Sequence, residues 1–63
     1  MMLEAVWYKD GKEIKRIDPV MNLLCEDDMN DISEIEINNG EYWYSSETLG
    51  IEADDFVIRI KVE

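Results

Sequence analysis

The chain has 63 residues, of which 16 are acidic and 6 are basic, with no histidine, one cysteine and a formal net charge of −10. This length predicts one small domain over residues 1–63. The charge excludes a direct nucleic-acid binder, which needs a basic face. The lone Cys25 excludes an internal disulfide or a cysteine-rich zinc site. No apolar run could span a membrane, and the first residues lack the parts of a signal peptide, so we expect a cytoplasmic protein.

The N-terminal segment predicts a β-hairpin. Segments 3–9 and 12–17 are rich in β-branched and aromatic residues and flank Asp10-Gly11, a dipeptide typical of a two-residue turn in which both positions need positive φ. This turn predicts the cross-strand pairs Trp7–Ile14, Tyr8–Glu13 and Val6–Lys15. Alternation predicts a core face of Leu3, Ala5, Trp7 and Ile14, and an outer face of Glu4, Val6, Tyr8, Glu13 and Lys15.

A helix is predicted to begin at Asp18-Pro19, because aspartate is a good N-cap and proline fits the first helical position. Its apolar stripe consists of Val20, Met21, Leu23, Leu24 and Cys25. We expect the helix to end near residues 29–30. The helix dipole favours cations at the C-terminus, but the acids Glu26, Asp27, Asp28 and Asp31 lie there instead. A departure from such a local preference points toward function.

A second hairpin is predicted around residues 38–40, between a strand over residues 32–37 and a strand that contains Tyr42, Trp43 and Tyr44. Two registers remain open. A two-residue turn at Asn39-Gly40 places Ile35 and Ile37 on the face of Tyr42 and Tyr44, whereas a three-residue loop places Trp43 on that face instead. In both registers at least one of the three aromatic side chains faces outward or lies at an edge.

The C-terminal part predicts a loop followed by a strand. Residues 45–55 are expected to form the loop, with a turn of helix or a short edge strand around residues 49–51. Residues 56–62 alternate clearly and predict a strand with the inward side chains Phe56, Ile58, Ile60 and Val62. The resulting order, β-β-α-β-β-β, predicts an α+β fold in which one helix packs on one face of a mainly antiparallel sheet.

Little in the chain predicts catalysis or a cofactor. Cys25 has no histidine to activate it and fits the apolar stripe of the predicted helix. A calcium loop that began at Asp28 would place Ile32 at its fifth position and would lack the central glycine. We therefore expect a protein that is not an enzyme and that has no metal or cofactor.

The acidic residues are concentrated in one part of the chain. Residues 17–58 contain twelve carboxylates and no basic side chain: Asp18, Glu26, Asp27, Asp28, Asp31, Glu34, Glu36, Glu41, Glu47, Glu52, Asp54 and Asp55. An ordinary soluble surface mixes the two signs of charge. Two interpretations remain open: the charge serves solubility, or it forms an electronegative surface for a basic partner.

The second interpretation gives the functional hypothesis. Residues i and i+2 of a strand lie about 6.6 Å apart on one face, which is close to the spacing of neighbouring phosphates. Glu34 and Glu36, preceded by Glu26, Asp27, Asp28 and Asp31, would then form a line of negative charge that a phosphate-binding groove attracts. In size and composition the chain resembles small acidic α+β proteins of bacteriophages that inhibit DNA-processing enzymes by imitating DNA.

That resemblance implies a nucleic-acid mimic that inhibits a basic, nucleic-acid-binding protein, such as a defence or repair enzyme. The alternative is an interaction or assembly domain that uses an aromatic patch around Trp43 or a sheet edge. A homodimer is compatible with the alternative, because so short a chain gains from a second copy. Neither hypothesis involves direct contact with nucleic acid or a membrane.

Overall fold

The Asp10-Gly11 dipeptide forms the predicted turn in the computed structural model, which describes residues 2–24 and 31–61. Asp10 and Gly11 have φ of 54° and 79°, as a turn with two left-handed positions requires. They join β1 (Met2–Lys9) to β2 (Lys12–Ile17), and Tyr8 pairs with Glu13 as predicted. The local turn chemistry therefore fixes the start of the hairpin.

Beyond the turn, the predicted register is wrong. A β-bulge at Trp7 and Tyr8 shifts the pairing by one residue, so that Trp7 lies opposite Lys15 instead of Ile14, and Val6 lies opposite Arg16 instead of Lys15. Ile14 is 40% exposed and leaves the core face, where Ile17 packs in its place. A bulge places two residues opposite one, and a turn dipeptide does not encode it.

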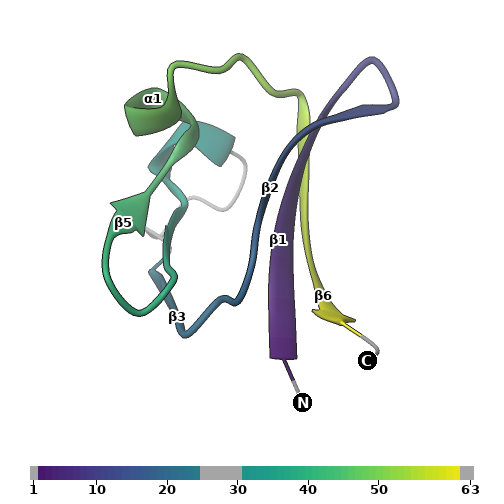
Figure 1. Ribbon diagram of the computed structural model, residues 1–63. Coiled ribbons are helices and arrows are strands. Elements are labelled where there is room, and N and C mark those ends of the chain that lie inside the picture. Colours follow the sequence, from purple (N-terminus) through teal and green to yellow (C-terminus); the bar gives the residue numbers. More distant parts are fainter. Residues whose placement is uncertain (1, 25–30, 62–63) are drawn as a thin grey trace.

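The last strand, β6 (Asp55–Lys61), pairs antiparallel with β1 on the side opposite β2, so that sheet A has the order β2-β1-β6 (Figure 1). Its Phe56 lies opposite Trp7, with ring centroids 5.0 Å apart. Phe56 and Ile58 pack against the core as predicted, whereas Ile60 is 56% exposed. Val62 lies outside the described residues.

The helix predicted from Asp18-Pro19 is wrong over the part that the structure describes. Residues 22–24 form the strand β3 (Asn22–Leu24) instead. The Val20 amide donates to the Leu3 carbonyl oxygen at 2.8 Å, and the Met21 amide donates to that of Asn38 at 2.7 Å. These groups bond to distant strands rather than within a helical turn, so tertiary pairing overrides the local signal. The expected C-terminal half of the helix, with Cys25, lies outside the described residues.

The second hairpin forms with a longer loop than either predicted register. Strands β4 (Glu36–Asn38) and β5 (Trp43–Tyr44) join β3 in sheet B, with the order β3-β4-β5. Ile37 lies opposite Tyr44, so the face predicted for the two-residue turn is confirmed and the three-residue alternative is wrong. Asparagine side chains build the loop: Asn38 Oδ1 accepts from the Gly40 amide, and Asn39 Oδ1 accepts from the amides of Glu41 and Tyr42.

Two short helical turns flank these strands. The predicted strand over residues 32–37 is wrong at its start, where Ile32–Glu34 forms the 3₁₀ turn η1. Of the two alternatives predicted around residues 49–51, the turn of helix forms and the edge strand does not, but the helix α1 (Ser46–Leu49) lies earlier than predicted and ends at Gly50 with φ of 69°. The fold is therefore a small α+β fold as expected, but the helix precedes the last strand rather than the third, and the strands form two sheets.

The core lies between the two sheets. Figure 1 shows sheet A on one side and sheet B with α1 and η1 on the other. Ala5 and Trp7 from β1, Val20 from the connection and Ile37 from β4 form the buried cluster. The indole nitrogen of Trp7 is buried and has no hydrogen-bond partner among the described residues. The inward assignment of Ala5 and Trp7 is confirmed, whereas Leu3 is 37% exposed.

The outer face of sheet A holds a buried carboxylate. Glu4 is only 4% exposed, and its oxygens accept from Arg16 Nη1 at 3.0 Å and from Arg59 Nε at 2.5 Å. Arg16 also binds Glu13, with Nη2 and Oε1 2.6 Å apart, and this bond lowers the pKa of Glu13 and raises that of Arg16. The bond to Glu4 likewise raises the pKa of Arg59. Glu4 lies on the outer face as predicted, but its burial was not expected from the sequence.

We predict that Glu4→Gln lowers the free energy of unfolding by about 1–3 kcal/mol, because hydrogen bonds to a charged group contribute on that scale. Glu13→Gln is the matched control, since it makes the same change of charge on the same arginine at an exposed site, and its loss should be much smaller. Urea unfolding measures both. Equal losses would mean that the buried position of Glu4 adds nothing to its ion pairs.

Candidate protein-binding surface

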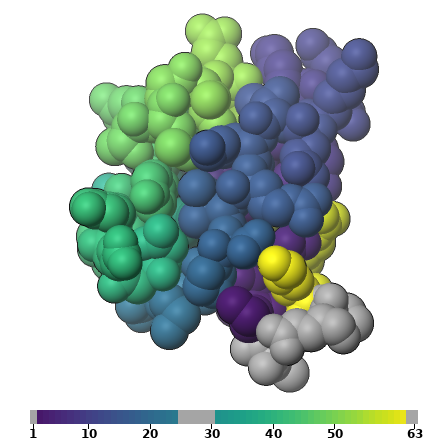
Figure 2. Space-filling model, viewed as in Figure 1, coloured from purple at the N-terminus to yellow at the C-terminus, as the bar shows by residue number. Residues whose placement is uncertain are grey.

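Residues 31–55, which we call the acidic segment, form η1, β4, β5, α1, their connections, the chain that leads to β6 and the first residue of β6. This segment has no lysine or arginine, and its eight carboxylates are Asp31, Glu34, Glu36, Glu41, Glu47, Glu52, Asp54 and Asp55. Seven of these residues are exposed, and Glu36 is half-buried. The segment therefore presents its charge to solvent (Figure 2, teal to light green).

No ion pair within the described residues reaches the acidic segment. The four pairs join Arg16, Arg59 and Lys61 to Glu4, Glu13 and Asp18. Asp18 has no basic neighbour in residues 17–58, but its Oδ1 lies 3.4 Å from Nζ of Lys61 in the folded chain. The other described acids of residues 17–58 form no ion pair with a described residue, so the separation of charge seen in the sequence is also present in the folded protein.

Three acids of this segment hold the local backbone. Asp31 Oδ1 accepts from the Ser33 amide at 3.0 Å and from the Ser33 hydroxyl at 2.6 Å, which caps η1. Asp54 Oδ2 accepts from the Asp10 amide at 3.0 Å, and Asp55 Oδ1 accepts from the Phe56 amide at 2.8 Å. Within the described residues, the side chains of the five glutamates of the segment make no hydrogen bond or ion pair. Their charge is therefore available to a partner.

The acids predicted to form a line along one strand are arranged differently in the structure. Glu34 lies in η1 and Glu36 in β4, and the buried Ile35 separates them. They do not form an i, i+2 pair of one strand, so the predicted spacing of about 6.6 Å has no basis. The structure describes Asp31, but Glu26, Asp27 and Asp28 lie outside the described residues. The described acids are spread over several elements rather than aligned on one.

Trp43 is the one predicted site residue that is not a carboxylate. It lies opposite Asn38 on the face of sheet B turned away from Ile37, and it is 47% exposed. Tyr42 is 62% exposed, and its ring meets that of Tyr44 edge to face at 6.4 Å. The expectation that one of these aromatics faces outward is confirmed. An indole and a phenol thus lie exposed beside the acids of the segment.

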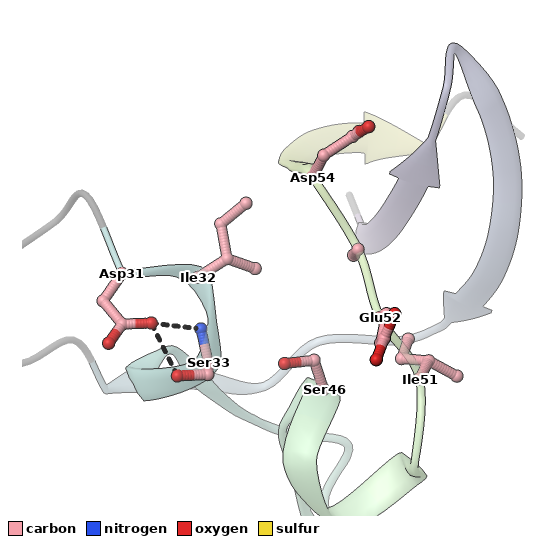
Figure 3. A pocket seen from close by; sticks show the side chains of 8 residues that line it. Asp31, Ile32, Ser33, Ser46, Ile51, Glu52 and Asp54 are labelled. Carbon is pink, nitrogen blue, oxygen red and sulfur yellow. Dashed lines mark hydrogen bonds between the residues drawn. The ribbon is translucent and has the colours of Figure 1, made fainter.

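The segment also contains an open pocket of about 470 Å³ that the sequence did not predict (Figure 3). Residues of η1, the first residue of α1 and the chain before β6 line it. Ser46, which sequence reasoning assigned to a loop, lines the pocket and is 6% exposed. No local pattern marks such a pocket, because its walls come from segments distant in the sequence.

The unpaired cations lie elsewhere. Lys9, Lys12 and Lys15 are exposed on the β1–β2 hairpin, and none forms an ion pair with a described residue. The hairpin projects from the end of sheet A in Figure 1. The three lysines therefore lie on the hairpin, whose turn meets the end of the acidic segment where Asp54 Oδ2 accepts from the Asp10 amide.

We predict that the melting midpoint rises by several degrees between low salt and about 0.5 M sodium chloride, where the Debye length is well below 10 Å. Salt screens repulsion among the exposed acids, whereas it weakens the ion pairs of the buried Glu4 less. The double variant Glu41→Gln/Glu47→Gln should show a smaller rise. A midpoint that falls with salt would show that attraction, not repulsion, dominates the surface charge.

Within the described ranges 2–24 and 31–61, no helix has the length and apolar character to cross a bilayer, and no three acidic, cysteine or histidine side chains are placed to hold a metal ion. Comparisons with protein-family models, with curated proteins and with solved structures find no match to this chain.

Proposed function

We propose that this protein binds the basic, nucleic-acid-binding surface of another protein through its acidic segment and thereby competes with nucleic acid. The observation that supports the proposal is the distribution of cations. Over residues 2–24 and 31–61, the cations in ion pairs bind Glu4, Glu13 and Asp18, and none binds the acidic segment. Unneutralised acids repel one another and weaken the compact state. A surface that keeps them gains a field that attracts basic partners.

The partner class follows from the chemistry of phosphate recognition. Proteins that bind nucleic acids neutralise phosphates with lysine and arginine, and the attraction is long-range and weakened by salt. Exposed carboxylates offer the same sign of charge and the same acceptor oxygens. The protein would act as an inhibitor without catalysis, of the kind that bacteriophages direct against defence or repair proteins.

A second candidate function rests on the exposed apolar side chains. Trp43 is 47% exposed, and Leu24 of the edge strand β3, which shares the Trp43 face of sheet B, is 48% exposed. Aromatic residues often form the centre of protein interfaces. An interaction or assembly domain would use this surface, and its binding would tolerate salt.

A capture experiment separates the two functions. The protein is immobilised, and the heparin-binding proteins of a bacterial lysate are passed over it. The proposal predicts that captured proteins elute by about 0.5 M sodium chloride and that short duplex DNA displaces them. Retention at high salt, unaffected by DNA but lost in Trp43→Ala, would overturn the proposal and support the second candidate.

Charge variants test where the captured protein binds. Glu34→Gln/Glu41→Gln/Glu47→Gln should lower its association rate by about tenfold or more, because the acids supply electrostatic steering. Glu41→Gln should slow association more than Asp10→Asn, an equal change of charge in the hairpin turn, where φ of 54° suits asparagine. Equal effects would mean that net charge, rather than the acidic segment, governs binding.

A further inference from the structure

In the part of the chain that the structure describes, the two sheets have four edge strands, and three of these carry features that discourage pairing with another chain. In sheet B the edge strands β3 and β5 are only three and two residues long. In sheet A the edge strand β2 bears Lys12, Glu13, Lys15 and Arg16, and its pairing with β1 contains a β-bulge. Short length, charged side chains and bulges protect exposed sheet edges from association.

The fourth edge strand, β6, lacks this protection. It is seven residues long, and it pairs with β1 without a bulge. Its central residues 56–58 carry no charge, and none of its residues is buried, in contrast to residues 4–7 of the central strand β1. Within residues 2–24 and 31–61 no strand pairs with its other side, and β6 lies at the edge of sheet A in Figure 1. It therefore presents a long, regular row of backbone N–H and C=O groups.

The sequence of β6 complements itself when two copies pair antiparallel about Ile58. In that register Asp55 of one copy lies opposite Lys61 of the other, so both ends of the pair join opposite charges. Phe56 lies opposite Ile60 of the second copy at two places, and alternation puts both side chains on the same face of the strand. Every residue of β6 then has a partner, and no two like charges are opposed.

The neighbouring registers are less favourable. Pairing about Val57 leaves Ile60 and Lys61 beyond the first residue of the second copy's β6. Pairing about Arg59 places two arginines directly opposite each other, and like charges in that position destabilise a strand pair. The register about Ile58 is therefore the one that the sequence of β6 favours.

The side chains that meet in this register are accessible. Ile60 is 56% exposed, so a second Phe56 that covers it removes apolar surface from water. Asp55 is exposed, and its bond to the Phe56 amide uses only Oδ1. Lys61 Nζ lies 3.4 Å from Asp18 Oδ1, but an ammonium group has three donors and can bind a second carboxylate.

We propose that two copies of this protein associate through β6, in a two-fold symmetric pair that joins the three-stranded sheet A of each copy into one continuous sheet. The inference does not rest on the proposed function. Each copy carries a formal net charge of −10, so salt that screens repulsion between the copies favours the pair.

Sedimentation equilibrium at about 0.5 M sodium chloride, where long-range repulsion is screened, measures the association. We expect a reversible dimer with a Kd of about 0.1 mM, because one pair of strands buries a small interface. A chain that stays monomeric at about 1 mM would overturn the proposal, because the dimer would then be too weak to be specific.

A mixture of isotope-labelled and unlabelled chains tests the register. Phe56 and Ile60 are four residues apart in one strand, which separates their Cα atoms by about 13 Å. A nuclear Overhauser effect between their side chains can therefore arise only between copies. We expect this effect in an experiment filtered for contacts between labelled and unlabelled chains. A dimer that lacks it, or whose contacts centre on Trp43, would show that another surface associates.

Charge variants distinguish strand pairing from net charge. Asp55→Lys places two lysines opposite each other at each end of the pair, and Lys61→Glu places two acids there. Each should weaken the dimer severalfold, and the double variant should restore it. Net charge alone predicts the reverse for Asp55→Lys, because that variant reduces the repulsion between copies.

Glu52→Lys is the matched control, since it makes the same change of charge as Asp55→Lys at an exposed residue outside β6. It should not weaken the dimer, and a well-dispersed amide spectrum confirms the fold of each variant. Equal weakening in Glu52→Lys and Asp55→Lys, or a double variant that does not recover, would contradict pairing through β6.

Discussion

Glu4 lies buried in the central strand of sheet A and accepts hydrogen bonds from both Arg16 and Arg59. A buried carboxylate is costly without charged partners, so both arginines are held on the outer face of this sheet. Their stems also cover apolar surface there, since Val6 lies opposite Arg16 and is fully buried. Lys61 at the end of β6 reaches Asp18. Glu4 and Asp18 together thus hold three of the 6 basic residues in the chain.

The rest of the surface follows from this distribution. The other cations are the three lysines of the β1–β2 hairpin, so the acidic segment is left with eight carboxylates and no basic side chain. A chain of this length buries a small core, and self-repulsion lowers a stability that is already modest. Interspersed charges would avoid that loss. The chain nevertheless retains separated charge, an exposed Trp43 and a partly polar pocket. These features are consistent with selection for binding rather than for stability.

Features encoded by neighbouring residues could be predicted from the sequence, and those created by distant pairing could not. Asp10-Gly11 specifies its own turn, and alternation places Trp7 in the core. The helix signal at Asp18-Pro19 is equally local, yet the next amides bond to other strands and the chain continues as β3. For the site, charge segregation was visible in composition, and exposure of one aromatic followed from strand alternation. The spacing of the acids and the burial of Ser46 depend on η1 and on the packing of its surroundings, which no sequence pattern encodes.

The separation of charge can be measured directly through paramagnetic relaxation of backbone amides by cationic and anionic nitroxides of equal size. Near a negative surface the cationic probe is enriched and the anionic probe is depleted. The account predicts the highest ratio of cationic to anionic relaxation at amides of residues 31–55 and the lowest at residues 9–15, with the difference reduced in high salt. A ratio that is uniform along the chain would contradict it, because the acids would then be neutralised within the folded protein.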